Sequence, residues 1–336
     1  MRKSFCTLIA VIALSGLSLA QNTPFFPEEL VVNATTLNMR DAPDINSQKV
    51  ASLQKGAVVQ FVEAWNNGQW VQADTLDTES PYAPWLKVRY KGKTGYVFGA
   101  YVTGTIGLYH EGDFYFNDMP LPQLNWYGLY RRDSFADELR PITVRLVEEM
   151  NEMYGEKIKV LKTNQSDESK FIIGSLEPMK TGYAGPLGIY DVRDMYLSGE
   201  LSPGATVSIH PGGDMNILND TTLKPSYLLT ATGCARMESN EYMYVRVTDY
   251  QLTLLDYTTQ PPVLQDLTPW VRTESEEINP VVSISWYGDI DMDGKPDAIL
   301  NDCPYEMGCR DALFLSSKAK PGEYLRKVCE HFWPGD

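Results

Sequence analysis

The chain is poor in the side chains on which many hydrolases depend. It has only three histidines, His110, His210 and His331, and none belongs to a His-Glu-x-x-His array, which disfavours a zinc hydrolase. It also lacks a Gly-x-Ser-x-Gly elbow and a phosphate-binding glycine loop. Cys234 has only His331 downstream, so a buried or disulfide-bonded cysteine is favoured over a nucleophile. No catalytic residue is assigned, although a glycosidase needs only two carboxylates.

No apolar run is long enough to cross a membrane comfortably. The longest, residues 8–19, follows the basic Arg2 and Lys3 and ends at the small-x-small site Ser18-Leu19-Ala20. This pattern predicts a cleaved signal peptide over residues 1–20, with the mature chain beginning near Gln21. We therefore expect a secreted or periplasmic protein that is not an integral membrane protein.

Basic residues are scarce relative to acidic ones. The chain has 29 Lys and Arg against 44 Asp and Glu, a net charge of −15. Such a surface repels nucleic acid and anionic lipid headgroups, so neither is an expected partner. It suits cations and neutral or basic polymers, while solubility alone is the simpler interpretation.

Cysteine is scarce as well, and no Cys-x-x-Cys pair suggests a metal-thiolate site. The predicted mature chain keeps an even number of cysteines, which favours disulfides in an exported protein and allows three connectivities. A Cys303–Cys309 or a Cys309–Cys329 bond would link the C-terminal segment, and free buried thiols are the alternative. The candidates are Cys234, Cys303, Cys309 and Cys329.

Short strands punctuated by turns fill residues 30–103. Lys91-Gly92-Lys93 separates two apolar-alternating runs at 85–90 and 94–97, which is typical of a hairpin. Further strands are predicted at 36–40, 50–53 and 57–62. Several short strands in about seventy residues predict a small β-barrel.

The blocks Leu37-Asn38-Met39-Arg40-Asp41-Ala42-Pro43, Leu53-Gln54-Lys55-Gly56 and Trp85 to Val97 resemble the bacterial SH3-like (SH3b) domain. The resemblance covers about a fifth of the chain. It implies a barrel of exported bacterial proteins that often binds peptidoglycan or other polymers. The insertion at 63–84 departs from the family pattern and carries Trp65, Trp70 and Tyr82. These aromatic residues either stack on sugars or peptides, or fold back over the barrel.

Residues 105–336 predict a larger domain, mostly of antiparallel β-strands with one main helix. The helix is expected after Pro141, because Ile142, Leu146, Met150 and Met153 keep helical spacing. Gly155 would end it. Strands are expected at 157–162, 170–173, 206–209, 227–232, 242–257, 281–287, 298–300 and 312–315. The overall class is therefore mainly β, or α+β when the helix is counted.

The loop at residues 289–297 carries the strongest chemical signal. Acidic residues at alternate positions of a tight loop repel one another unless a cation lies among them. Calcium prefers such oxygen ligands, and Gly294 permits the sharp turn. The predicted calcium ligands are Asp289, Asp291, Asp293, Asp297 and the backbone carbonyl of Lys295. Magnesium fits a flexible multi-carboxylate site less well, and a merely solvated acidic turn is the alternative.

The loop is similar to the short calcium loops of dockerin, thrombospondin-type and FG-GAP-type modules, and it is not an EF-hand, because Leu300 stands where glutamate would be. The C-terminal stretch, with its Gly-Asp-x-Asp-x-Asp-Gly-Lys-x-Asp loop, also resembles uncharacterised exported proteins of Bacteroidota-like bacteria, a resemblance that implies no activity. We expect an exported, non-catalytic binding protein that docks on peptidoglycan or another envelope polymer or protein. The alternatives are a cell-envelope hydrolase and a scaffold with no ligand beyond calcium.

Overall fold

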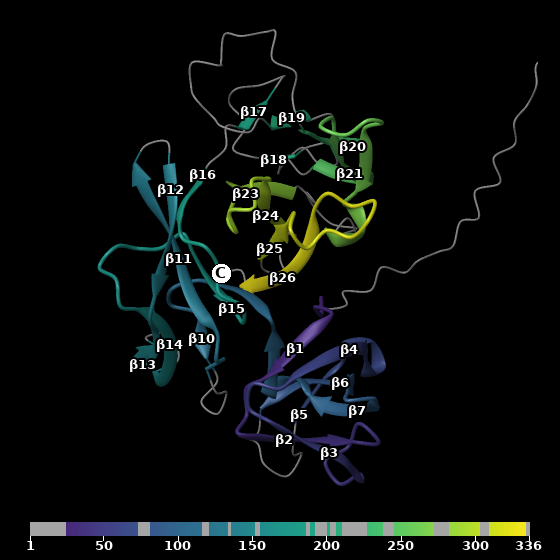
Figure 1. Cartoon of the computed structure of the whole chain (residues 1–336), viewed down its shortest axis with the longest axis vertical. Coiled ribbons are helices and arrows are strands. Elements are labelled where there is room, and N and C mark those ends of the chain that lie inside the picture. The colour runs from purple at the N-terminus through teal and green to yellow at the C-terminus, as the bar shows by residue number, and fades with distance from the viewer. Residues whose placement is uncertain are drawn as a thin grey trace, which may run out of the picture.

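The described part of the chain consists mostly of antiparallel β-strands (Figure 1). This confirms the predicted mainly β class. Helical structure among the described residues is limited to the 3-10 turns η1 (Trp65–Gly68), η2 (Gly99–Tyr101) and η4 (Thr268–Trp270). The computed structural model describes residues 25–72, 81–115, 121–133, 136–151, 155–185, 189–191, 200–201, 206–209, 227–237, 245–271, 282–302 and 309–333. The predicted signal peptide, residues 1–20, lies outside these ranges.

Eight strands form the N-terminal module. They pair in the order β3-β2-β7-β6-β4-β1-β8, and β5 pairs with β6. Side chains from seven of these strands meet in one apolar cluster around Met39, Leu53 and Val88, so the sheet curls around a single core without closing. The strands are β1 (Glu29–Val32), β2 (Thr36–Arg40), β3 (Lys49–Gln54), β4 (Val58–Ala64), β5 (Trp70–Gln72), β6 (Tyr82–Tyr90), β7 (Lys93–Phe98) and β8 (Val102–Gly104).

Local sequence explains these strands. In β2, Leu37 and Met39 are buried while their neighbours are more exposed, the period-two alternation of a half-buried strand. The β6–β7 hairpin turns at Lys91 and Gly92, which both have positive φ, as its two-residue turn requires. The predicted strands at 36–40, 50–53, 57–62, 85–90 and 94–97 all fall on strands of the module.

Three five-stranded sheets contain most of the described residues after the module. We name them after one strand each. The β11 sheet has the order β16-β12-β11-β15-β9, the β24 sheet β18-β23-β24-β25-β26, and the β20 sheet β17-β19-β20-β21-β22. The strands of the β11 sheet are β9 (Ile106–Tyr109), β11 (Asn125–Asp133), β12 (Ala136–Ile142), β15 (Phe171–Ser175) and β16 (Gly182–Gly185). The other two sheets comprise β17 (Ile189–Asp191), β18 (Glu200–Leu201), β19 (Thr206–Ile209), β20 (Tyr227–Met237), β21 (Val245–Asp256), β22 (Val263–Asp266), β23 (Val282–Gly288), β24 (Asp297–Asp302), β25 (Cys309–Leu315) and β26 (Arg326–Trp333).

The β24 sheet lies between the other two sheets (Figure 1). Alternate residues of one strand point to opposite faces, so Leu300 packs with residues of the β20 sheet and Ile299 with residues of the β11 sheet. Phe314 and Leu313 divide in the same way on β25. Burial on both faces explains why these strands read as continuous apolar runs.

The predicted main helix is wrong. Residues 144–151 form β13 (Val144–Asn151), which pairs along its length with β14 (Glu156–Thr163). Leu146 and Met150 are four residues apart on β13, and an even spacing places them on one face of a strand as well as of a helix, whereas Ile142 ends β12. The partner segment, β14, has alternating apolar residues that include β-branched ones, and this favours a strand hairpin over a helix. A short strand, β10 (Phe114–Tyr115), completes this sheet in the order β10-β14-β13.

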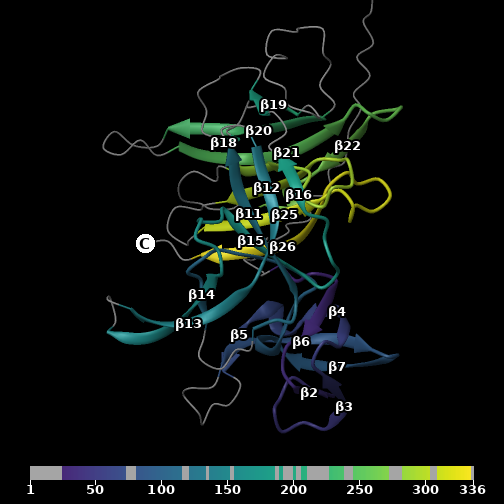
Figure 2. The same ribbon diagram turned by 60° about the vertical axis from the view of Figure 1, so that its left-hand side comes forward.

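The N-terminal module lies below the stacked sheets in both views (Figure 1 and Figure 2). The chain passes from the module to the rest of the molecule through Thr105, between β8 and β9. Within the described residues, no helix has the length and apolar character needed to span a bilayer.

Candidate functional site

The acidic loop connects two paired strands of the β24 sheet. Gly288 at the end of β23 pairs with Asp297 at the start of β24, which closes the loop. Gly294 has a φ of +89°, a conformation that side chains disfavour. At Gly288 a Cβ would lie 2.1 Å from the carbonyl oxygen of Ala184, so only glycine fits against β16. Asp289 donates its backbone N–H to that same carbonyl at 2.7 Å. The β23–β24 pairing and the contact with β16 of the β11 sheet therefore fix where the loop begins.

Backbone N–H groups hold two of the loop carboxylates in place. Asp289 accepts from the N–H groups of Asp293 and Gly294 at 3.0 and 2.9 Å. Asp297, fully buried, accepts from Ile290 and Ser316, each at 2.8 Å. Because Ser316 follows β25, the loop is tied to the β25–β26 connection as well as to its own strands.

Three of the predicted ligands come together. Asp289, Asp291 and Asp297 each offer an oxygen, and these oxygens lie within 4.8 Å of one another. Asp293 is not part of this group, because its carboxylate accepts from the backbone N–H of Lys295 at 2.8 Å and from Ser316 Oγ at 3.3 Å. The side chains of Asp291 and Ser317 are also hydrogen-bonded.

Burial and mutual repulsion make the loop carboxylates costly in their charged form. Burial raises the pKa of Asp297 well above its usual value, and the charge of Asp291 adds to the effect. Burial is also the largest cause of the raised pKa of Asp291, and the negative charges of Asp293 and Asp289 raise this pKa further. Asp291 Oδ1 is buried without a hydrogen-bond partner among the described residues. This oxygen-only donor set, with one oxygen unsatisfied, fits a hard divalent cation such as Ca²⁺.

The three aromatic residues of the predicted ligand site divide into two kinds. Trp65, at the start of η1, packs against the apolar cluster around Trp85 and Phe98. Trp70 and Tyr82 lie on paired strands and stay exposed, at 48% and 56%. Their ring centroids are 6.3 Å apart with an interplanar angle of 28°, a stacked arrangement. Trp65 therefore covers the module, and Trp70 and Tyr82 form an exposed aromatic pair.

The aromatic pair borders a groove of about 460 Å³ between the N-terminal module and the rest of the chain. Asn33, Trp70 and Tyr82 line it from the module, and Asp113, His331 and Phe332 line it from the other side. Sequence reasoning missed Asn33 and Phe332. Nothing in their local sequence marks them, because the groove exists only where β26 packs beside the module.

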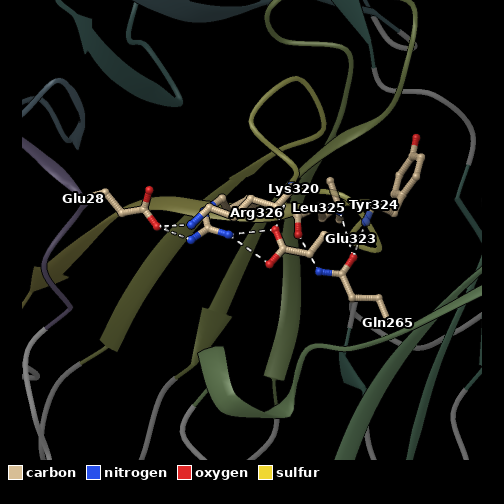
Figure 3. Close-up of polar contacts among 7 residues, drawn as sticks. All are labelled: Glu28, Gln265, Lys320, Glu323, Tyr324, Leu325 and Arg326. Carbon is tan, nitrogen blue, oxygen red and sulfur yellow. Dashed lines mark hydrogen bonds and ion pairs between the residues drawn. The ribbon is translucent and has the colours of Figure 1, made fainter.

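A polar network fixes the module against the C-terminal strands (Figure 3). The carboxylate of Glu28 accepts from both Lys320 and Arg326, and Arg326 Nη1 also donates to Glu323 at 2.8 and 2.9 Å. The hydrogen bond from Lys320 is the main cause of the lowered pKa of Glu28. Gln265 holds the same segment from β22, because its Oε1 accepts from the backbone N–H groups of Tyr324 and Leu325 at 2.7 and 2.9 Å.

The two described histidines face each other, with ring centroids 5.0 Å apart. His110 Nε2 lies 3.0 Å from Asp311 Oδ2, and His331 Nε2 lies 3.2 Å from Asp113 Oδ1. Burial alone would raise the pKa of Asp311, but hydrogen bonds from His110, Asn301 and other donors outweigh it and lower this pKa. These contacts join β9 and its following turn to β25 and β26, and His210 lies outside the described residues.

The cysteines are in different states. Cys309 is disulfide-bonded, whereas Cys234 is an exposed free thiol and Cys329 a buried one. The alternative of a Cys309–Cys329 bond is therefore wrong, because Cys329 is a free thiol. Cys329 packs in the apolar core, on a strand that pairs with the strand of Cys309. Burial raises the pKa of the Cys329 thiol. Cys303 lies outside the described residues.

Comparison with known proteins gives one family. Residues 35–103 match the family described as Bacterial SH3 domain, which confirms the resemblance read from the three sequence blocks. The match spans β2 to β8, so the exposed aromatic pair and its flanking strands belong to it. A search of curated proteins finds no match to the chain. Residues 35–103 are therefore the part of the chain that is similar to the bacterial SH3 domain family.

Proposed function

We propose that the chain is an exported binding protein whose SH3 domain docks on peptidoglycan or on another polymer or protein of the cell envelope. Bacterial SH3 domains are commonly cell-wall binding modules, and residues 35–103 match that family. The observation that carries the proposal is the exposed, stacked pair of Trp70 and Tyr82 on this domain. Monomeric proteins seldom leave large stacked aromatic side chains in solvent without a binding role.

Two features support an exported location. Residues 1–20 have the basic start, apolar centre and small-residue end of a signal peptide. Cys309 is disulfide-bonded, and structural disulfides persist mainly in oxidising compartments. Both features support a secreted or periplasmic protein, for which envelope polymers would be accessible.

The proposal includes one structural calcium ion in the 289–297 loop. Asp289, Asp291 and Asp297 would hold it, because their oxygens converge and carry unfavourable charge when no cation is bound. A bound cation would offset that repulsion and fix β23 to β24. Extracellular calcium is near millimolar, so an affinity of about 10⁻⁴ to 10⁻³ M keeps the site mostly filled.

Co-sedimentation with purified peptidoglycan tests the binding role. The full chain is expected in the pellet at micromolar concentration, and the variant Tyr257→Ala, which removes an exposed aromatic residue of the β20-sheet region, should pellet equally. A chain that stays in the supernatant with every envelope fraction would support the scaffold alternative. A loss of turbidity in the wall suspension would support the hydrolase alternative. Either result contradicts the proposal of a non-catalytic binder.

A further inference from the structure

The groove between the SH3 domain and β26 is a candidate binding site with walls from two parts of the chain. We propose that it holds a short, uncharged glycan segment, with Phe332 and Asn33 contributing beside the aromatic pair. This inference rests on the proposed envelope binding and deepens it, because it names the class of ligand and assigns part of the site to residues outside the SH3 domain.

The apolar walls suit the flat C–H faces of sugar rings. Trp70 and Tyr82 present stacked rings on one side of the groove, and Phe332 of β26 is 49% exposed on the other. In register, Phe332 pairs with Arg310 of β25, so the backbone of β26 fixes its position. Burial of these three exposed rings against a ligand supplies the apolar part of the binding free energy.

The groove contains one buried hydrogen-bond acceptor without a donor among the described residues. Asn33 is 4% exposed, and its Oδ1 has no hydrogen-bond partner among the described residues. A buried acceptor without a donor is unfavourable, so a ligand hydroxyl or amide N–H that reached it would be favoured. The carboxylate of Asp113 also lines the groove, but it already accepts from the backbone N–H of His110 at 2.7 Å and lies 3.2 Å from His331 Nε2. The site therefore selects a ligand rich in donors, as sugars are.

Charge argues for an uncharged ligand. The described residues that line the groove include no Lys or Arg, whereas Asp113 and Glu330 are acidic. Glu330 is already engaged by Lys327 Nζ at 2.7 Å and by the backbone N–H of Phe25 at 3.0 Å. A ligand that carried carboxylates would meet no cation here and would be repelled by a chain of net charge −15. A neutral glycan fits better than a peptide with free carboxylates.

The two walls are held at a fixed distance. Glu28 joins Lys320 and Arg326 across the junction, and the Phe25–Glu330 hydrogen bond adds a second connection. A groove that exists before the ligand arrives avoids much of the ordering cost of binding. The C-terminal strands thus complete a site that the SH3 domain alone would leave open on one side.

Titration calorimetry of the full chain with a neutral N-acetylglucosamine oligomer tests the inference. Trp70→Ala and Phe332→Ala are each expected to weaken binding about tenfold. Asn33→Ala should weaken it several-fold without lowering the melting temperature, since its Oδ1 bonds to no described residue. Tyr257→Ala is the matched control and should bind as the unchanged chain does. Thermal unfolding of each variant separates lost binding from lost folding.

The outcomes distinguish this inference from the proposed function. If Trp70→Ala weakens peptidoglycan binding while Phe332→Ala and Asn33→Ala do not, the SH3 domain binds the wall and the two-walled glycan groove is wrong. Binding of a wall stem peptide with free carboxylates, but not of the glycan oligomer, would also overturn it. If the chain binds neither oligomer nor wall, the proposed function fails as well.

Discussion

Asp137 shows how donors can offset the cost of burying a carboxylate in this protein. Asp137 is fully buried and accepts from Lys170 Nζ at 2.6 Å and from Trp286 Nε1 at 2.9 Å, with Arg131 Nε 3.1 Å from its other oxygen. This arrangement links β12 and β15 to β23 across the interface of two sheets. Removing a charge from water is costly, and such partners are what make it tolerable.

Asp311 gives a pH-dependent prediction. Its folded-state pKa is lowered, so its contribution to stability is present above the unfolded-state pKa, about 4, and is lost as pH falls through the folded-state value. Asp311→Asn should lower the free energy of unfolding by about 1–3 kcal/mol at pH 7. Urea denaturation from pH 7 to pH 3 should show this difference narrowing as pH falls. A difference that stays constant over that range would contradict the assigned ionised state.

At the scale of elements, the acidic loop is the part with a ligand-dependent stability. The convergence of Asp289, Asp291 and Asp297 predicts that calcium at a hundred times its dissociation constant adds about 2.7 kcal/mol to the free energy of unfolding. Asp291→Ala should abolish that gain and leave the SH3 domain folded. Asp44→Ala, a change at an exposed turn of the SH3 domain, is the matched control and should keep the gain.

Calorimetric melting with calcium and with a chelator provides the measurement. Equal melting temperatures in the two conditions for the unchanged chain would contradict calcium binding at this loop. A calcium-dependent shift that Asp291→Ala leaves intact would place the ion elsewhere.

Sequence patterns predicted the strands and turns correctly where neighbouring residues alone determine the local structure. The turn at Lys91 and Gly92 and the alternation around Leu37 were sufficient for the SH3 strands, and the alternate aspartates placed a loop between two strands. The spacing of Leu146 and Met150 fits both a helix and a strand, and only the pairing of β13 with β14 distinguishes the two. Asp293 was expected among the converging carboxylates, but hydrogen bonds from the distant Ser316 hold it apart.

At the scale of the whole molecule, the junction between the SH3 domain and the stacked sheets could not be predicted. Phe25 and Glu330 are hydrogen-bonded across 305 residues of sequence, and no local pattern reports such a contact. The same is true of the groove, whose walls come from both ends of the chain. The resemblance to the SH3b domain, the acidic excess and the aromatic residues of the 63–84 insertion were the sequence features that pointed to binding.

The Glu28 network predicts how the two parts stay together. Glu28→Lys places a third cation beside Lys320 and Arg326, so like charges should push the SH3 domain away from the C-terminal strands. Small-angle scattering should show a larger radius of gyration for this variant. Glu29→Lys makes the same charge change at an exposed neighbour and should leave the radius unchanged. Equal radii for the two variants would contradict a holding role for Glu28.

The central claim is that the SH3 domain binds an envelope polymer through its exposed aromatic pair. The most direct measurement is the dissociation constant of the full chain for purified peptidoglycan, compared with that of the double variant Trp70→Ala/Tyr82→Ala. Loss of both stacked rings should weaken binding at least about tenfold at an unchanged melting temperature. Equal dissociation constants for the two proteins would contradict the claim.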